Sequence, residues 1–526
     1  MIGPEILELH ARPPSLQTRR SSRPRSPSTK EPSCSSSACW AVKLERHLWL
    51  RFYISVLCPA RSTPCTYCGD VSSPGVKDLF PSASAAPSFR RINIRRPLRA
   101  RLRRAETSAC KQQKSGIAAA EILLIGGRSG EVEKGREGSR GPTNIPERVM
   151  QAMNRNNEDH RSPAFPVFSK ALISDVKRLF KSTKGTCFII PTTGSGGWES
   201  ALTNTLSPGD KILTYRLGQF SHLWIGRMTR LNFEVEVVDL EWGSGVDLEQ
   251  FRSKISADRS HSFKAVCIVH NETSTAVTND IGGMRRILDS VGHPALLLVD
   301  AVSSIAGLDF RMDEWKVDVA LTGSQKALSM PCGLGILCAS PKALEAAKSA
   351  KSLRVFFDWG DYLSAYKSGT YWPYTPSIQL LYGLRAALDM IFEEGLDCVI
   401  ARHHRFGEAT RLAVKAWGLK LCTTNPMWYS DTVTSVLVPQ HIDSGDVVKL
   451  AWKKYNLSLG VGLGDIAGKA FRIGHIGHLN ELQLLGALAG VELVLNEVGV
   501  KVPLGSGVVA AGTYLSKSTP LIVSRL

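Results

Sequence analysis

From Gly141 onward, short apolar runs rich in β-branched residues alternate with segments of helical period. Apolar strands separated by amphipathic helices are typical of a parallel sheet whose two faces are covered by helices. The strands are expected at residues 187–191, 211–214, 233–238, 265–269, 295–299 and 317–321. The helices between them are expected at residues 197–206, 221–231, 248–255 and 282–291. In such sheets, functional residues collect at the carboxyl ends of the strands.

A second set of elements begins near Gly407 and indicates a smaller α+β domain. Its helices are expected at residues 407–417, 445–455 and 481–498, and its strands near 433–438 and 470–473. The sequence therefore predicts an α/β protein with four parts. These are a basic extension at 1–140, a large domain at 141–405, a small domain at 406–510 and a tail at 511–526.

The basic charge is concentrated at the front of the chain. Residues 1–140 hold 25 Lys and Arg against 11 Asp and Glu, and the remaining residues hold 40 against 36. We interpret this Arg-, Ser- and Pro-rich segment as an unstructured extension; the alternatives are a transit peptide and a nucleic-acid-binding arm. Because no binding module is recognisable there, nucleic acid is not an expected partner.

Neither a membrane nor a metal ion is expected to bind this chain. No run of eighteen apolar residues is present, so no transmembrane helix is predicted. Cys65 and Cys68 form a single C-x-x-C pair without the second pair that a structural zinc site needs. The six cysteines after residue 140 lie in apolar surroundings, which is typical of buried thiols.

Two polar features follow expected strands of the large domain. A loop of Thr, Gly and Ser residues between Pro191 and Ser200 opens a helix, and such a loop can hold a phosphate group through its backbone N–H groups. An ordinary strand-to-helix turn is the alternative interpretation. Asp300 directly follows an apolar run and could pair with a protonated pyridine nitrogen or cap a helix.

Two cations complete the candidate site. Lys326 follows another apolar run and precedes a Gly-rich turn, where its amine could form an imine with an aldehyde and then act as a general base. Arg472 lies within an expected strand of the small domain and could hold a carboxylate through two hydrogen bonds. A solvated lysine and a surface ion pair are the alternatives.

The order of these features, together with three longer stretches, resembles the class V aminotransferases. The resemblance covers about residues 141–526, and within the family it is strongest to plant peroxisomal enzymes that use serine and glyoxylate. The stretches that carry it are residues 144–149, 152–159 and 200–210 and the lysine segment at 323–335. Two departures stand out: residues 137–140 replace the usual lead into Gly141, and Ala276 stands where the family has glycine.

The resemblance implies a fold-type I enzyme that binds pyridoxal 5'-phosphate. It assigns the covalent link to Lys326, the ring nitrogen to Asp300, and ring stacking to Trp198. It assigns the substrate to Arg472 and Gln325. The remaining cofactor contacts that it implies are Thr193, Gly194, Ser195, Thr273 and Gln325, with Tyr374 and Thr375 supplied by the neighbouring subunit of a homodimer.

The resemblance also implies an activity and a compartment. The expected reaction moves the amino group of serine to glyoxylate, with alanine or asparagine as further donors. The alternatives are an alanine–glyoxylate aminotransferase, a cysteine desulfurase that would use a mobile thiol, and an inactive or nucleic-acid-binding protein. The final residues, Ser524-Arg525-Leu526, are a close variant of the tripeptide that the peroxisomal import receptor reads, which predicts a peroxisomal location.

Overall fold

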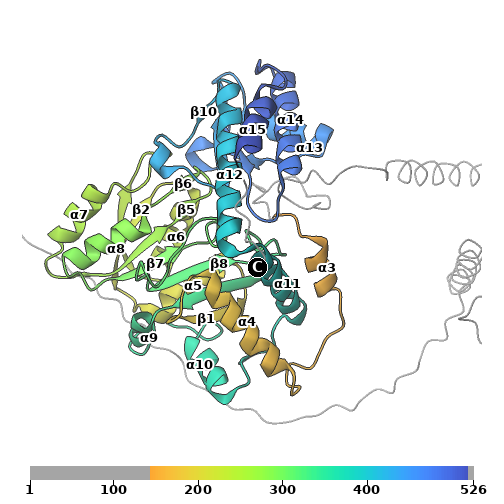
Figure 1. The fold of residues 1–526 in the computed structure, drawn as a ribbon. Helices are drawn as coiled ribbons and strands as arrows, with labels where there is room; N and C mark the ends of the chain where they lie inside the picture. Colours follow the sequence, from red (N-terminus) through yellow and green to blue (C-terminus); the bar gives the residue numbers. More distant parts are fainter. Residues whose placement is uncertain (1–142, 519–526) are drawn as a thin grey trace, which may run out of the picture. The chain divides into compact units, whose positions relative to one another are not determined.

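The computed structural model describes residues 143–518, all of which lie in one compact unit (Figure 1). The expectations for residues 1–140 and for the C-terminal tripeptide therefore fall outside the described residues. Within 143–518, no helix is both long and apolar enough to cross a bilayer. The described chain contains two larger β-sheets, each packed against its own helices, and one two-stranded hairpin.

The larger sheet has seven strands in the order β1-β9-β8-β7-β4-β2-β3. Six strands run parallel to one another, and β9 is antiparallel to both of its neighbours. The strands are β1 (Thr186–Pro191), β2 (Lys211–Arg216), β3 (Glu234–Asp239), β4 (Phe263–Val269), β7 (Leu296–Asp300), β8 (Val319–Gly323) and β9 (Leu334–Ala339). The expected mainly parallel sheet is confirmed, and β9 is an addition that the sequence analysis did not predict.

Helices cover both faces of this sheet. Consecutive residues of β1 alternate between two cores, with Cys187 and Ile189 in one and Phe188 and Ile190 in the other. The first core is closed by α3 (Glu147–Met153), α4 (Phe165–Leu179), α7 (Leu248–Ala257), α8 (Ile281–Ser290) and α11 (Ile378–Glu394). The second is closed by α5 (Gly194–Thr205), α6 (Gln219–Arg230), α9 (Pro341–Ala347) and α10 (Trp359–Ser368). This double cover explains why the strands read as continuous apolar runs.

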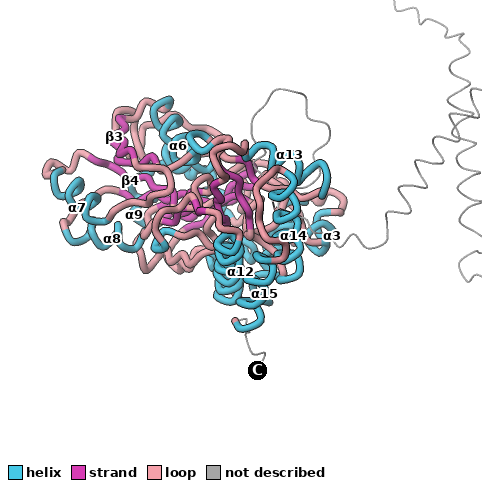
Figure 2. The backbone as a smooth tube through the Cα atoms, turned by 90° about the horizontal axis from the view of Figure 1, so that it is seen from above, coloured by secondary structure: helices cyan, strands magenta, loops and turns pink. Residues whose placement is uncertain are grey.

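The smaller sheet is antiparallel, with the order β10-β11-β13-β12. Its strands are β10 (Lys420–Leu421), β11 (Val433–Leu437), β12 (Gly460–Val461) and β13 (Ala470–Gly474). A third core lies between this sheet and its helices α12 (Leu396–Ala416), α13 (Ser444–Tyr455), α14 (Glu481–Glu497) and α15 (Ser506–Lys517), which stand together in Figures 1 and 2. A two-stranded hairpin of β5 (Asn271–Glu272) and β6 (Val277–Thr278) lies near the larger sheet's edge.

Five helices of the larger sheet, α3, α4, α9, α10 and α11, were not predicted, and two further differences lie in α12 and α15. Helix α12 begins at Leu396 rather than near Gly407, and it carries Val399 in the core of the larger sheet and Phe406 in the core of the smaller one. The boundary expected between residues 405 and 406 falls inside this helix, so the division into domains stays a prediction. Helix α15 occupies the first part of the expected tail and packs against α12.

A buried carboxylate fixes the start of α15. Glu492, only 2% exposed, accepts hydrogen bonds from the backbone N–H groups of Gly505 and Gly507 at 2.6 and 2.7 Å, and from the Trp417 indole at 2.9 Å. The negative charge lies where the helix presents its unpaired N–H groups and the positive end of its dipole. Glu492 therefore ties α12, α14 and α15 into one unit.

We expect Glu492→Leu to lower the free energy of unfolding by about 3 kcal/mol, because four N–H groups, those of Gly505, Gly507, Val508 and the Trp417 indole, lose this acceptor. Urea denaturation followed by circular dichroism measures this change. The control is Glu497→Leu at the end of the same helix, where the carboxylate is more exposed and bonded to Lys454. Equal effects of the two substitutions would contradict the role assigned to Glu492.

Candidate active site

The candidate site lies where neighbouring strands of the larger sheet end. Asp300 is the last residue of β7, and Lys326 comes three residues after the end of β8. Because β7 and β8 are adjacent and parallel, their carboxyl ends lie at the same edge of the sheet. Both residues line one open cavity of about 610 Å³. The sequence analysis therefore selected two residues that the fold brings together.

The N-terminus of α5 forms one wall of this cavity. Thr193 is the extended residue before the helix, and Thr193, Gly194 and Ser195 all line the cavity. A Cβ atom at Gly194 would lie 2.7 Å from a methyl group of Val302, so a larger residue would force this wall apart. Backbone N–H groups at a helix start, beside a glycine, can hold an anionic group such as a phosphate.

The Asp300 carboxylate is buried and held by two donors. The Trp198 indole donates to Oδ2 at 2.9 Å, and the backbone N–H of Val302 donates to Oδ1 at 2.8 Å. Burial raises the pKa of Asp300 to about 6 despite these two hydrogen bonds. Within residues 143–518, no cation forms an ion pair with this carboxylate. The site therefore carries the cost of a buried negative charge, which a bound cationic group would offset.

Lys326 is the only lysine among the residues that line either cavity at this site. Burial, together with the positive charge of Arg472, lowers the pKa of its amine to about 8. No hydrogen bond or ion pair within residues 143–518 engages the amine. An amine with this pKa is partly neutral near pH 8, as a nucleophile and a general base must be.

A second open cavity, of about 630 Å³, adjoins the first. Lys326, Thr273, Ser303 and Phe220 line both cavities, whereas Arg472 lines only the second. The Arg472 guanidinium is positioned by hydrogen bonds to the carbonyl oxygens of Val461 and Thr273, at 3.0 and 3.1 Å. The second cavity therefore combines a buried guanidinium with the amine of Lys326.

The N-terminal end of the described chain also reaches the second cavity. The backbone N–H of Thr143 donates to the Gln325 carbonyl at 3.1 Å, and its hydroxyl donates to the Lys326 carbonyl at 3.0 Å. Thr143 is 5% exposed and lines the second cavity. The segment that follows Gly141 is thus fixed against the backbone of the lysine loop.

A polar cluster in the walls of the two cavities links the two sheets. The Asn271 amide donates to the hydroxyls of Ser303 and Thr432 at 2.9 and 3.0 Å, and the Thr432 hydroxyl donates to the Ser303 carbonyl at 3.0 Å. Thr432 precedes strand β11 of the smaller sheet, and the other two residues follow strands of the larger sheet. These buried bonds hold the Arg472 side of the site against the Lys326 side.

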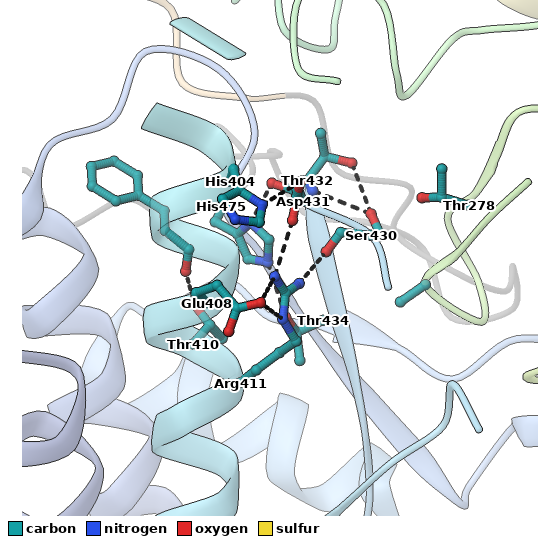
Figure 3. Close-up of polar contacts among 12 residues, drawn as sticks. Thr278, His404, Glu408, Thr410, Arg411, Ser430, Asp431, Thr432, Thr434 and His475 are labelled. Atoms are coloured by element: carbon teal, nitrogen blue, oxygen red, sulfur yellow. Dashed lines mark hydrogen bonds and ion pairs between the residues drawn. The ribbon is translucent and has the colours of Figure 1, made fainter. Parts of the chain in front are cut away.

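Figure 3 shows what fixes the chain beside Thr432. Asp431 accepts hydrogen bonds from Arg411 and His404 of α12, both at 3.0 Å, and Arg411 also donates to the Ser430 carbonyl at 2.7 Å. These charges lower the pKa of Asp431 against the opposing effect of burial. The entry to β11 is therefore anchored to α12 by a charged network that does not line the cavities.

The other expected site residues have different surroundings. Trp198 lines the first cavity, and its indole stacks on Trp224 with ring centres 6.0 Å apart. Gln325 lines the same cavity, and its buried Oε1 has no hydrogen-bond partner within residues 143–518. The Thr273 hydroxyl donates to Ser303 at 2.9 Å. All the residues that were assigned to one subunit's site therefore line one of the two cavities.

Tyr374 and Thr375, which were assigned to a neighbouring subunit's site, line neither cavity of their own chain. The Tyr374 hydroxyl donates to Asp361 at 2.5 Å, and its ring stacks on Phe356. Thr375 is exposed. Their positions leave the assignment to a second subunit as a prediction.

Sequence reasoning missed several residues that line the cavities: Thr143, Phe220, Asn271, Ser303, Thr432 and Ser458. Asn271 and Ser303 had the same signal as Asp300, since each lies just beyond an apolar strand. The others are brought to the site by tertiary packing, and no local pattern marks them. Within residues 143–518 no cysteine lines either cavity, and Cys332 is exposed outside them.

The backbone at Ala276 explains why the family resemblance leads to glycine there. Its φ is +62°, in the left-handed region where a Cβ atom is unfavourable by about 1–2 kcal/mol. The conformation is fixed because its N–H donates to the Glu272 carbonyl and its own carbonyl accepts from Ser430 and Thr423. The alanine keeps the turn at a cost in backbone strain.

Comparison with known proteins identifies this arrangement. The sequence pattern of the family Aminotransferase class-V matches residues 139–463. The chain belongs to the class V aminotransferases. It is 67% identical to a serine–glyoxylate aminotransferase of Arabidopsis thaliana, with 73% of this chain and 96% of the relative covered. The corresponding enzyme of Methylorubrum extorquens is 55% identical over 72% and 95% of the two chains.

Solved structures of aminotransferases share the fold. A ureidoglycine–glyoxylate aminotransferase of Bacillus subtilis matches with a TM-score of 0.67 and 27% identity, covering 72% of this chain and 97% of that one. The chain is thus a fold-type I aminotransferase, and enzymes of this family depend on pyridoxal 5'-phosphate.

The described residues fit this cofactor at each of its polar groups. The start of α5 offers N–H groups for the phosphate, the unpaired Asp300 carboxylate suits a protonated ring nitrogen, and Lys326 offers an amine. The buried Oε1 of Gln325 still needs a donor. A cofactor with these groups would satisfy charges and acceptors that the chain itself leaves unmatched.

In the cofactor-free protein, we expect Asp300→Asn to raise the free energy of unfolding. The increase should be about 1 kcal/mol larger at pH 8 than at pH 5. The native pKa of about 6 lies above the unfolded value of about 3.9. The wild-type protein therefore loses stability as the pH rises through 6, because the buried carboxyl ionises. The Asp300→Asn variant has no such group and does not. Urea denaturation at both pH values measures this difference.

The control for this prediction is Asp446→Asn at an exposed position on α13. Its effect on the free energy of unfolding at pH 8 should be smaller than that of Asp300→Asn, because its side chain is exposed. If the Asp300→Asn effect were independent of pH, the buried charge would not carry the cost that we assign to it.

Proposed function

We propose that this aminotransferase moves the amino group of serine to glyoxylate, giving hydroxypyruvate and glycine. The structural observation that carries the proposal is the second cavity. Its lining contains a buried arginine, the catalytic lysine and several hydroxyl groups. The names of the three relatives above support glyoxylate as the acceptor, since all three include it. The relatives from Arabidopsis thaliana and Methylorubrum extorquens also include serine as the donor.

Arg472 would bind the carboxylate that serine and glyoxylate share. Arg472 is 6% exposed, and its guanidinium is held in place by two carbonyl oxygens. A guanidinium fixed in this way offers a carboxylate charge-assisted hydrogen bonds in a dry environment, where they are strongest. The bound carboxylate would place the substrate's α-carbon on the Lys326 side of the same cavity.

Lys326 would remove the proton from the α-carbon of the amino donor and return a proton to the acceptor's carbon. Its lowered pKa keeps a fraction of the amine neutral near pH 8, so it can take up a proton. Desolvation also keeps water away from the reacting carbon. The absence of ion-pair partners within residues 143–518 leaves the amine able to move between the two cavities.

The cofactor, when bound, supplies an electron sink for the electron pair left at the α-carbon. Asp300 would keep the ring nitrogen protonated, Trp198 would pack against the ring, and Thr193, Gly194 and Ser195 would hold the phosphate. Thr273 and Gln325 would contact the remaining polar groups. Each of these residues lines the first cavity.

We also propose a homodimer in which Tyr374 and Thr375 complete the partner's phosphate site. An exposed apolar segment lies close to Tyr374 and supports this arrangement. Leu353 and Val355 are 95% and 80% exposed, and Phe356 stacks on Tyr374. Exposed apolar side chains gathered in this way commonly mark an interface.

Stopped-flow spectroscopy of the cofactor-loaded protein tests the reaction. Serine should change the absorbance band of the bound cofactor and release hydroxypyruvate, and glyoxylate should then restore the band and yield glycine. Lys326→Ala should slow turnover by a factor of about a hundred to ten thousand, because the general base is lost. Lys348→Ala, at an exposed site on the surface, is the matched control.

A response to alanine with none to serine would replace serine as the donor while keeping the enzyme class. Sulfide release from cysteine would instead favour a desulfurase. A band that responds to no amino acid would overturn the proposed function.

We propose that the enzyme acts in the peroxisome. The support is the tripeptide Ser524-Arg525-Leu526, which lies outside the described residues, and the strong similarity to a plant enzyme. A fluorescent protein fused to the N-terminus of the full chain should coincide with a peroxisomal marker in plant cells. Removing the tripeptide should disperse the signal, and an unchanged distribution would contradict the proposal.

A further inference from the structure

The wall of the second cavity carries five hydroxyl groups, from Thr143, Thr273, Ser303, Thr432 and Ser458. A hydroxyl has one proton to donate and two lone pairs with which to accept. A hydroxyl whose proton is already used by the protein can therefore accept from a substrate but cannot donate to it. Which of the five can donate is settled by their hydrogen bonds.

Four of the five protons are used within the protein. The four bonds run from Thr143 to the Lys326 carbonyl (3.0 Å), from Thr273 to the Ser303 hydroxyl (2.9 Å), from Ser303 to the Asn271 carbonyl (2.7 Å) and from Thr432 to the Ser303 carbonyl (3.0 Å). Within residues 143–518, the Ser458 hydroxyl has no hydrogen-bond partner. It is the one hydroxyl of this wall with a proton left to donate.

Ser458 lies in the segment that leads into β12. Leu457 and Leu459 are buried in the core of the smaller sheet, whereas Ser458 and Gly460 are half-buried. Ser458, Leu459 and Gly460 all line the second cavity.

Gly460 in turn places this segment against the substrate-binding arginine. It is paired with Arg472 across strands β12 and β13. A Cβ atom at Gly460 would lie 3.1 Å from the Arg472 Nε atom, so the two are in contact. Ser458, two residues before Gly460 in the chain, therefore lines the same cavity as the proposed carboxylate site.

We propose that Ser458 donates a hydrogen bond to the β-hydroxyl oxygen of the amino donor and so favours serine over alanine. This inference rests on the proposed function. A carboxylate is matched by the charged guanidinium of Arg472, whereas a neutral hydroxyl needs both a donor and an acceptor. Ser458 supplies the donor, and neighbouring wall hydroxyls such as Thr143 keep lone pairs that can accept the substrate's own proton.

The kinetic test compares two amino donors that differ by one hydroxyl. In Ser458→Ala, kcat/KM for serine at saturating glyoxylate should fall about tenfold, the usual effect of losing one neutral hydrogen bond. The value for alanine should stay within about twofold. Ser458→Thr keeps a donor hydroxyl and should retain most of the wild-type preference for serine.

Ser444→Ala is the matched control. Ser444 lies at the start of α13 in the same part of the fold, and its hydroxyl also has no partner within residues 143–518. It lines neither of the two cavities. This substitution should leave the ratio of serine to alanine turnover unchanged.

A binding measurement avoids turnover altogether. L-Glycerate and L-lactate carry a hydroxyl in place of the α-amine, cannot be transaminated, and differ from each other by the β-hydroxyl alone. Calorimetric titration of the cofactor-loaded protein should show that Ser458→Ala weakens L-glycerate about tenfold and leaves L-lactate unchanged.

The outcomes separate this inference from the proposed function. If the wild type does not use serine with glyoxylate, the proposed function fails. If it does, and Ser458→Ala lowers serine and alanine turnover equally, the residue acts on the shared carboxylate or on the fold, and the inference is overturned. An unchanged ratio in both the kinetic and the binding test also overturns it.

Discussion

The adjacency of β7 and β8 is the constraint on which the rest of the site depends. Because these two parallel strands are hydrogen-bonded neighbours, Asp300 and Lys326 emerge at the same edge of the sheet. Burial then makes both charges unfavourable, which raises the pKa of the carboxyl and lowers that of the amine. The fold thus buries two ionisable groups whose charged forms are unfavourable. A cofactor with a cationic ring can pair with the carboxylate, and its aldehyde can react with the amine.

The smaller sheet contributes the residues to which we assign substrate recognition. Arg472 and Ser458 come from its strand β13 and from the segment before β12, and neither belongs to the cofactor cavity. The contact between the sheets is polar, through Asn271 and Thr432, rather than only apolar. Hydrogen bonds depend on geometry and therefore fix the relative position of the two sheets more strictly than apolar packing does. The distance between the proposed carboxylate site and the lysine is fixed in this way.

Sequence patterns predicted the parts of this structure that depend on local order. Apolar runs ended by a polar residue marked Asp300 and Lys326, because strand burial and strand ends leave a direct trace in the chain. They did not predict β9, because its start at Leu334 lies among the glycines of the stretch that was interpreted as a turn. Ser458 and Thr143 were missed because loops and tertiary contacts bring them to the cavity, and the assignment of Tyr374 to a second subunit stays a prediction.

Helix α12 has a consequence for how members of this family can be recombined. It is continuous from Leu396 to Ala416, contributes to the cores of both sheets, and follows Gly395, whose φ is +91°. A chimaera joined at residue 405 would take the two halves of one helix from different parents and mismatch both cores. A crossover at Gly395 keeps the helix with the smaller sheet, so the exchangeable module begins ten residues before the position that sequence alone suggested.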